Sequence, residues 1–179
     1  ILTGALIAEL ESKGHVVPGS ETVVGVVRTG IAVKAGHTVP AVHSAAALST
    51  LLRRASGIYF PDPIKATAGI HFMKVLKTLG LHDELSGRLR PFPNGATAMR
   101  EMAQAVGSDL VGCTQVTEIL YTPGVQLVAA LPKEFELATV YAAAVCSRAG
   151  DRGGAARLVR LLSSDEIAPL RKAGGFELS

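Results

Sequence analysis

Short runs of apolar and β-branched residues alternate along this chain with segments of about ten residues whose apolar positions have helical spacing. The predicted strands cover residues 23–33, 57–60, 89–92, 109–114, 125–131 and 139–146. Helices are predicted over residues 4–12, 45–54, 68–79, 95–106, 153–162 and 165–172. Strands that alternate with helices build parallel sheets through right-handed crossovers. The alternation therefore predicts an α/β protein, in which the run 23–33 is a strand covered on both faces.

The composition limits the classes of function. Of the 179 residues, 48% are hydrophobic and 18% are charged, which suits one large core or two small ones and argues against disorder. The net charge is +3, the basic residues are scattered, and only 4% of the residues are aromatic. Nucleic-acid-binding proteins normally combine a basic stripe with aromatic platforms, so we expect no nucleic-acid partner. No apolar stretch reaches the roughly 18 residues of a membrane helix.

The sequence contains no recognisable catalytic or metal-binding motif. Its five His lie outside H-E-x-x-H patterns, and G-x-S-x-G, P-loop and G-x-G-x-x-G motifs are absent. Cys113 and Cys146 form no C-x-x-C pair, and we expect both to be small buried hydrophobic residues. A disulfide between them stays an open alternative. The sequence therefore predicts no catalytic residue, no metal site and no cofactor.

A first candidate binding segment covers residues 62–70, where a strand ends and a helix begins on small residues. Thr67 is predicted to cap this helix, and Ala68 and Gly69 follow in its first turn. The N–H groups at a helix start are unpaired and carry the positive end of the helix dipole. Small residues let a ligand approach these groups, so an oxyanion or carboxylate would fit without a charged side chain.

Two further segments have similar features. Asn94 is predicted to cap the helix 95–106, and Thr97 lies in its first turn. Gln115 follows an apolar strand at its carboxyl end, where ligands of open α/β sheets bind. Two helix starts aimed at one point would form an anion site, with Gln115 as an amide donor. The alternative is that both helices are ordinary capped helices and that Gln115 is a solvated loop residue.

The order of these segments resembles the molybdate-binding-like branch of the type II periplasmic solute-binding proteins. The matching stretches are Asp62-Pro63 with Ala68-Gly69-Ile70, residues 76–80, Val111-Gly112, residues 124–132, and Gly175-Phe176. The resemblance implies a type II periplasmic-binding-protein fold, an α/β fold of two lobes whose central mixed sheets are joined by two crossing strands. It places residues 1–28 and 138–179 in an incomplete first lobe and residues 29–137 in the second lobe.

The resemblance also implies a ligand site. Family members hold an anion through backbone N–H groups and neutral hydroxyls in the cleft between the lobes. By position, Ala68 would supply an N–H group, Thr97 would lie at the second helix start, and Gln115 would replace a tyrosine of the molybdate binders. The full set of expected ligand-binding residues is Thr67, Ala68, Gly69, Asn94, Thr97 and Gln115. The change at Gln115 favours a small organic carboxylate over molybdate.

These inferences predict the substrate-binding component of an ABC importer, which binds a small anion in the periplasm and delivers it to a membrane permease. A cytoplasmic location stays open. One alternative is an isomerase of small tricarboxylates on the same scaffold, such as an aconitate isomerase, although the residues offer no convincing base. Another is the effector-binding domain of a transcription regulator.

The sequence begins at Ile1, inside an apolar run and without a Met or a signal peptide. We therefore expect a missing upstream segment, which in this family carries the remaining binding loops. That segment or a homodimer would cover the incomplete lobe. A helix start contributes about 0.3–1 kcal/mol to a nearby anion, and at most ~2 kcal/mol. Micromolar affinity requires about 8 kcal/mol, so the 179 residues alone should bind their ligand poorly.

Overall fold

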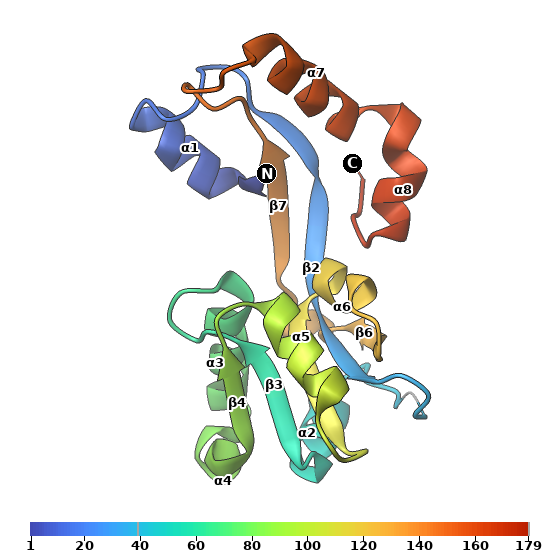
Figure 1. The fold of residues 1–179 in the computed structure, drawn as a ribbon. Helices are drawn as coiled ribbons and strands as arrows, with labels where there is room; N and C mark the ends of the chain where they lie inside the picture. The colour runs from blue at the N-terminus through green and yellow to red at the C-terminus, as the bar shows by residue number, and fades with distance from the viewer. Residues whose placement is uncertain (39, 179) are drawn as a thin grey trace. The chain divides into compact units, whose positions relative to one another are not determined.

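The computed structural model describes residues 1–38 and 40–178, and these form two compact units (Figure 1). Unit 1 comprises Ile1–Val27 and Ala138–Ser179, and unit 2 comprises Arg28–Leu137. The lobe boundaries expected from the sequence differ from these by one residue, at 28/29 instead of 27/28. The predicted α/β class is confirmed. Within the described ranges, no helix is both long and apolar enough to cross a membrane.

Unit 2 contains a mixed sheet. Strands β3 (Gly57–Pro61), β4 (Leu89–Phe92) and β5 (Leu110–Gln115) are parallel, with β3 in the middle. The long strand β2 (Thr22–Lys34) runs antiparallel to both β5 and β6 (Val125–Ala130). The strand–helix alternation alone predicted parallel sheets, and this was wrong for β2, which lies between β5 and β6 and runs antiparallel to both. Strands β5 and β6, which are connected by α6 (Val116–Tyr121), therefore run in the same direction.

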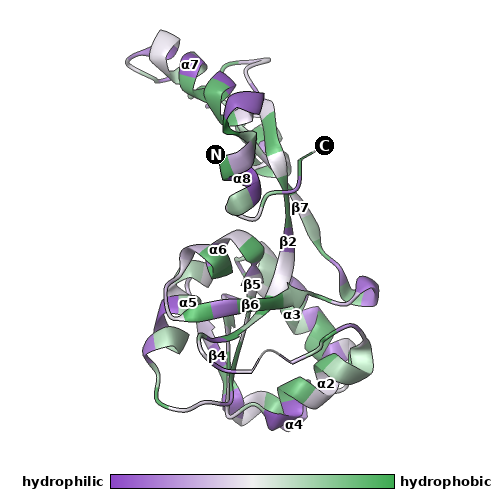
Figure 2. Ribbon diagram, turned by 90° about the vertical axis from the view of Figure 1, so that its right-hand side faces the viewer, coloured by the Kyte–Doolittle hydropathy of each residue, from purple (hydrophilic) through white to green (hydrophobic). Residues whose placement is uncertain are grey.

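Helices cover both faces of this sheet (Figures 1 and 2). Helices α2 (Ala45–Arg54) and α3 (Thr67–Thr78) pack on one face, and α5 (Gly95–Gln104) packs on the other. Side chains of a strand alternate between the two faces. On β5, Val111 and Cys113 therefore join the core under α3, whereas Leu110 joins the core under α5. Burial raises the pKa of the Cys113 thiol, which keeps it protonated and unreactive.

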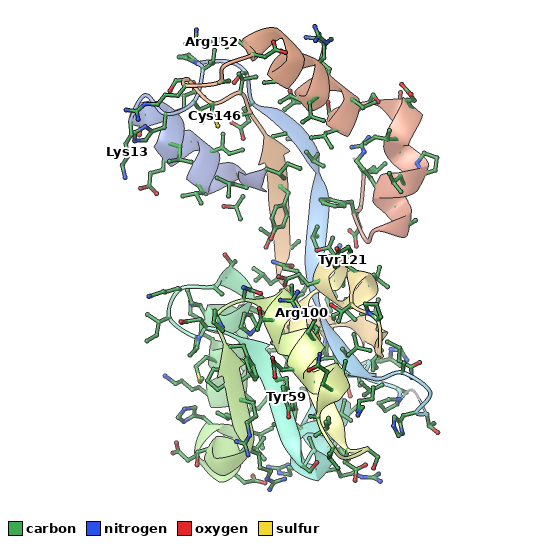
Figure 3. All side chains as sticks on the ribbon, in the orientation of Figure 1. Lys13, Tyr59, Arg100, Tyr121, Cys146 and Arg152 are labelled. Atoms are coloured by element: carbon green, nitrogen blue, oxygen red, sulfur yellow. The ribbon has the colours of Figure 1, made fainter. Side chains whose placement is uncertain are left out.

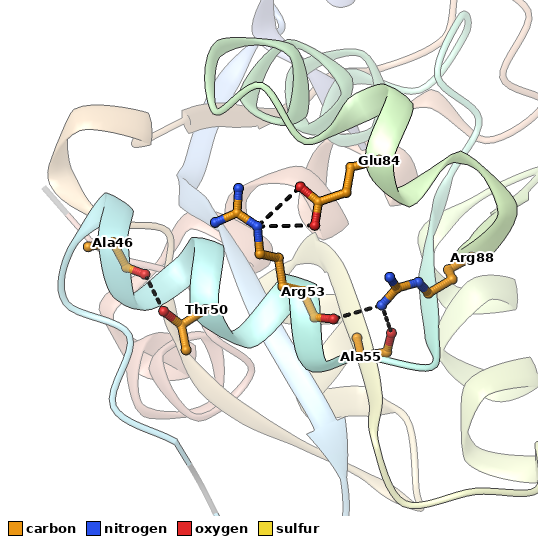
Figure 4. A network of polar contacts seen from close by, with 6 residues as sticks. All are labelled: Ala46, Thr50, Arg53, Ala55, Glu84 and Arg88. Carbon is orange, nitrogen blue, oxygen red and sulfur yellow. Dashed lines mark hydrogen bonds and ion pairs between the residues drawn. The ribbon is translucent and has the colours of Figure 1, made fainter.

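The end of α2 is fixed to α4 (His82–Leu85) and the short 3-10 helix η1 (Ser86–Arg88) by polar contacts (Figure 4). The Arg88 guanidinium donates to the carbonyl oxygens of Arg53 and Ala55, at 2.7 and 3.0 Å. The Arg53 Nε lies 3.1 Å from both carboxylate oxygens of Glu84. Arg88 therefore satisfies carbonyl groups that the end of α2 leaves unpaired.

Unit 1 contains β1 (Leu2–Thr3), α1 (Gly4–Ser12), β7 (Ala138–Ala143), the 3-10 helix η3 (Asp165–Ile167), and the helices α7 (Arg152–Ser163) and α8 (Ala168–Ala173). Strand β7 pairs with β1 and lies next to β2 in the sheet. The Arg171 guanidinium joins three segments, because it donates to the carbonyl oxygens of Val24, Ser163 and Ser164 at 2.5–3.1 Å. This contact fixes α8 against β2 and the end of α7.

Four local predictions need correction. Thr67 does not cap α3, because the N-cap is Ala66 and Thr67 is the first helical residue. Residues 118–120, which lie outside every predicted helix and strand, belong to α6. The predicted helix 165–172 divides into η3 and α8 at Pro169, which lies in the first turn of α8 and lacks an N–H donor. Both cysteines are free, and Cys146 is exposed instead of buried because it follows the end of β7.

Candidate functional site

The six expected ligand-binding residues lie at one edge of the sheet in unit 2. Strands β3, β4 and β5 are parallel, so their carboxyl ends meet at this edge. Helix α3 begins after β3, α5 begins after β4, and Gln115 is the last residue of β5. We call this region the carboxyl edge. It has two sides, because α3 and α5 pack on opposite faces of the sheet.

The start of α3 is open. Its N-cap residue, Ala66, has no side-chain oxygen to accept a hydrogen bond. The N–H of Ala66 donates to the Asp62 carbonyl at 3.1 Å, and that of Ile70 donates to the Ala66 carbonyl at 2.9 Å. The intervening N–H groups, of Thr67, Ala68 and Gly69, donate to no acceptor in residues 1–38 and 40–178. These three donors can therefore serve an external acceptor, and the helix dipole favours an anionic one.

Gly69 has a structural role at this start. A Cβ atom at this position would lie 2.2 Å from the Pro61 carbonyl oxygen and 2.3 Å from that of Asp62. Both contacts are to backbone, which cannot move aside without displacing the strand end. The missing side chain therefore lets α3 begin directly against the end of β3.

The carboxylate nearest to this start in the sequence, Asp62, serves its own loop. Its Oδ1 accepts hydrogen bonds from the N–H groups of Ile64 and Lys65 at 2.7 and 3.0 Å. The bond from Ile64, followed by that from Lys65, lowers the pKa of Asp62, so the carboxyl group stays ionised at neutral pH. Asp62 thus shapes the loop before α3 and leaves the first-turn donors of α3 uncapped.

Thr29 and Gln115 lie next to each other on the face of the sheet that α3 covers. They are directly paired across β2 and β5. Each lies two residues along its strand from a core residue under α3, Ile31 on β2 and Cys113 on β5, so their side chains face the same side of the sheet as these. Thr29 is 1% exposed and Gln115 is 4% exposed. The hydroxyl of Thr29 has no hydrogen-bond partner in the described part of the chain. A buried hydroxyl without a partner costs about 1–3 kcal/mol, and a bound ligand could remove that cost.

The start of α5 is closed by the protein itself. The Asn94 side chain accepts a hydrogen bond from the Thr97 N–H at 2.8 Å, as the sequence predicted for a cap. The Glu118 carboxylate accepts from the Ala96 N–H at 3.1 Å through Oε1, and from the Thr114 hydroxyl at 2.5 Å through Oε2. Glu118 is therefore an internal anion at the start of α5.

Gly95 allows this contact. A Cβ atom at Gly95 would lie 1.9 Å from the Thr114 hydroxyl oxygen and 2.1 Å from Glu118 Oε2. The hydroxyl of Thr97 accepts a hydrogen bond from Arg100 at 3.1 Å, and Figure 3 shows Arg100 on α5. The N–H and the hydroxyl of Thr97 thus both have partners within α5 or its cap. A ligand-binding role for Asn94 and Thr97 stays a prediction.

Other ionisable groups of unit 2 have structural contacts. The Arg28 guanidinium forms an ion pair with the Glu136 carboxylate. His71 Nε2 lies 2.7 Å from the Phe135 carbonyl oxygen, so this side chain of α3 has a hydrogen-bond partner. Among the described residues, no group of three or more His, Cys, Asp or Glu side chains gathers as a metal site.

Two site features were missed from the sequence, Thr29 and Glu118. Thr29 and Arg28 are the polar residues that interrupt the apolar run 23–33, and this interruption was the available signal for Thr29. No local pattern marks Glu118, because it lies on α6 and the partners of its side chain lie on two other elements, β5 and α5.

A family model covers nearly the whole chain. It describes bacterial extracellular solute-binding proteins, and it matches residues 1–177. The chain belongs to this family. The predicted resemblance to type II periplasmic solute-binding proteins of the molybdate-binding kind is thereby confirmed, together with the predicted fold.

Solved structures of this fold are similar to the chain at low sequence identity. The periplasmic molybdate-binding protein of Azotobacter vinelandii is 16% identical with a TM-score of 0.74, over 99% of this chain and 76% of that protein. The substrate-binding domain of a putative molybdenum ABC transporter from Clostridium difficile is 14% identical with a TM-score of 0.69, over 98% and 73%. These similarities concern the fold.

Among characterised proteins, the aconitate isomerase of a Pseudomonas species is 23% identical over 181 residues. The match covers 99% of this chain and 66% of the isomerase. This chain therefore spans just under two thirds of the length of that relative.

Proposed function

We propose that this chain belongs to the substrate-binding component of an ABC importer and binds a small anion, an organic carboxylate or an oxyanion, at the start of α3. One observation carries the proposal, namely that unpaired donors gather on one face of the carboxyl edge. Within the described residues, three first-turn N–H groups of α3 have no acceptor, and the buried Thr29 hydroxyl has no hydrogen-bond partner. Gln115 lies beside Thr29 and would add an amide donor.

Family membership supports the role in transport. Solute-binding proteins hand their ligands to membrane permeases, and the neighbours named above include a part of an ABC transporter. On this basis we propose a periplasmic location and a permease as the macromolecular partner.

The energy of these contacts predicts that other parts of the protein contribute. One helix start supplies at most ~2 kcal/mol, and each hydrogen bond from Thr29 or Gln115 supplies about 1 kcal/mol. The sum is about 4 kcal/mol, which corresponds to millimolar binding. We therefore expect weaker than micromolar affinity for the 179-residue chain alone, and tighter binding for the full-length natural protein.

The test is isothermal titration calorimetry of the full-length protein with molybdate, sulfate, lactate, malate and citrate. We expect micromolar binding of at least one of these anions, weakened about tenfold by Thr29→Val. The same substitution at Thr122, whose hydroxyl donates to the Glu118 carbonyl at 2.7 Å, is the matched control and should leave binding unchanged. Binding that is equally strong in wild type and Thr29→Val would contradict the proposed site.

The similarity to aconitate isomerase favours a second candidate, the isomerisation of a small tricarboxylate. That reaction needs a base that takes a proton from the substrate. At the carboxyl edge, both oxygens of Glu118 are already hydrogen-bonded, so a base would come from elsewhere in the protein. Incubating the full-length protein with cis-aconitate and measuring trans-aconitate by chromatography distinguishes this candidate from a transport role.

A further inference from the structure

Glu118 places a fixed negative charge at the candidate binding edge, and nothing in the proposed function requires it. Its carboxylate takes the Ala96 N–H and the Thr114 hydroxyl, so it occupies the place at the start of α5 that an anionic ligand would otherwise take. A side chain at position 95 would collide with this carboxylate, and Gly95 has none. Residues 95, 114 and 118 are thus fitted to one another around an internal anion.

This charge lies close to the proposed ligand site. Thr114, the hydrogen-bond partner of Glu118, is adjacent in β5 to Gln115, and their side chains point to opposite faces of the sheet. The charge and the proposed ligand site thus lie on opposite faces of one sheet at the same edge. Salt screens exposed charges over about 8 Å at physiological ionic strength, so screening reduces the repulsion between them.

Nearby cations do not cancel this charge. Arg100 on α5 is exposed, and its guanidinium donates to the Thr97 hydroxyl. Arg28 is paired with the Glu136 carboxylate. The Glu118 carboxylate has neutral partners, an amide and a hydroxyl, and the positive end of the α5 dipole offsets only about half of its charge.

We propose that Glu118 shifts the selectivity of this site towards singly charged anions and away from doubly or triply charged ones. The inference rests on the proposed function, since it concerns the charge of the ligand at the start of α3. The energy of repulsion from Glu118 is proportional to the charge of the ligand, so it is twice as large for a dianion as for a monoanion of the same shape. If this repulsion lowers the association constant of the monoanion by some factor, it lowers that of the dianion by the square of the factor. The contribution of Glu118 thus favours a monocarboxylate or another monoanion as the ligand and disfavours a tetrahedral dianion such as molybdate.

Perrhenate and tungstate test this inference, because both are tetrahedral oxyanions of nearly equal size, with one and two negative charges. Their dissociation constants are measured by calorimetry on the full-length protein and on Glu118→Gln, whose amide keeps the shape, can accept from the Ala96 N–H and can donate to the Thr114 hydroxyl oxygen. Glu118→Gln should strengthen perrhenate binding about threefold and tungstate binding about tenfold. The control, Glu101→Gln, removes the same charge from an exposed position of α5 and should leave the ratio unchanged.

Other outcomes overturn the inference. It is wrong if removal of the Glu118 charge gives no gain for tungstate, or equal gains for both ions. If these results come with a loss of binding in Thr29→Val, the site at α3 is retained and only the charge selectivity fails. Glu118→Ala removes the same charge and is measured in the same way, so poor folding of Glu118→Gln does not prevent the test.

Discussion

The starts of α3 and α5 are built alike and are occupied differently. Each follows a parallel strand of unit 2, and each has a glycine that permits a close approach, Gly69 in α3 and Gly95 in α5. At α5 the approaching group is a carboxylate, and Asn94 caps the first turn. At α3 the approaching groups are backbone carbonyls, and the first-turn donors stay uncapped. A helix start whose donors are satisfied internally is a structural element, whereas one left open beside an unpartnered hydroxyl is suited to a ligand.

The largest expected effect concerns the two glycines. Glycine to alanine normally stabilises a helix by up to about 1 kcal/mol. Gly69→Ala should instead destabilise the protein by about 3 kcal/mol or more, because the new methyl group meets two backbone carbonyls. Gly95→Ala should cost about 1–2 kcal/mol, since the Glu118 side chain it meets can rotate away.

Urea unfolding of the two variants, followed by circular dichroism, measures both costs. Gly87→Ala is the control, because nothing lies within 4 Å of its new methyl group and its stability should change by less than about 0.5 kcal/mol. Equal costs at Gly69 and Gly95 would show that α3 and β3 can separate, and would remove the packing reason for a glycine there.

The second prediction converts the α3 start into the α5 type. Ala66 has φ −97° and ψ 129°, which suits a capping residue, so Ala66→Asp should place a carboxylate over the free N–H groups. Stability should rise by about 0.5–1 kcal/mol, and affinity for an anion should fall more than tenfold because the new carboxylate competes for the same donors. Thermal unfolding and calorimetry on one preparation measure the two changes. A variant that is more stable and still binds normally would mean that the ligand does not use these donors.

The converse change at α5 completes this comparison. Asn94→Ala removes the bond to the Thr97 N–H and should cost about 1 kcal/mol of stability. Because Glu118 still occupies the start of α5, we expect little change in affinity. A large loss of affinity in Asn94→Ala would restore the alternative in which both helix starts bind the ligand.

The sequence predicted where the two helix starts lie, but it did not predict that one is capped internally and the other is open. Helical spacing and small residues indicated both helix starts, and the apolar strand before Gln115 indicated the carboxyl edge. These are local signals within about ten residues. Thr29 and Glu118 were missed because their importance depends on the pairing of β2 with β5 and on contacts between separate elements. The same limit explains the error at Thr67, where a capping hydroxyl was expected one residue after the actual cap.

The third prediction uses Thr29, where stability and binding should change in opposite directions. Thr29→Val keeps the shape of the side chain and removes the buried hydroxyl that has no partner. The free protein should gain about 1 kcal/mol of stability, whereas ligand affinity should fall about tenfold. Thr122→Val removes a hydroxyl that is hydrogen-bonded, so it should lose about 1 kcal/mol. Loss of stability in Thr29→Val would mean that its hydroxyl already has a partner, and it would no longer support a ligand contact.

The smallest expected effect isolates a single N–H group. Thr67 is exposed and is the first helical residue of α3, a position at which proline is favoured. The preceding residue, Ala66, already has the extended conformation that a residue before proline adopts. Thr67→Pro should therefore leave stability within about 0.5 kcal/mol of wild type while it removes one donor from the open start. Calorimetry should show about a three- to fivefold loss of anion affinity relative to Thr67→Ala, which lacks the hydroxyl but retains the N–H. If the proline and alanine variants bind equally well, the first N–H group does not contact the ligand, and the anion would have to lie deeper, over the donors of Ala68 and Gly69.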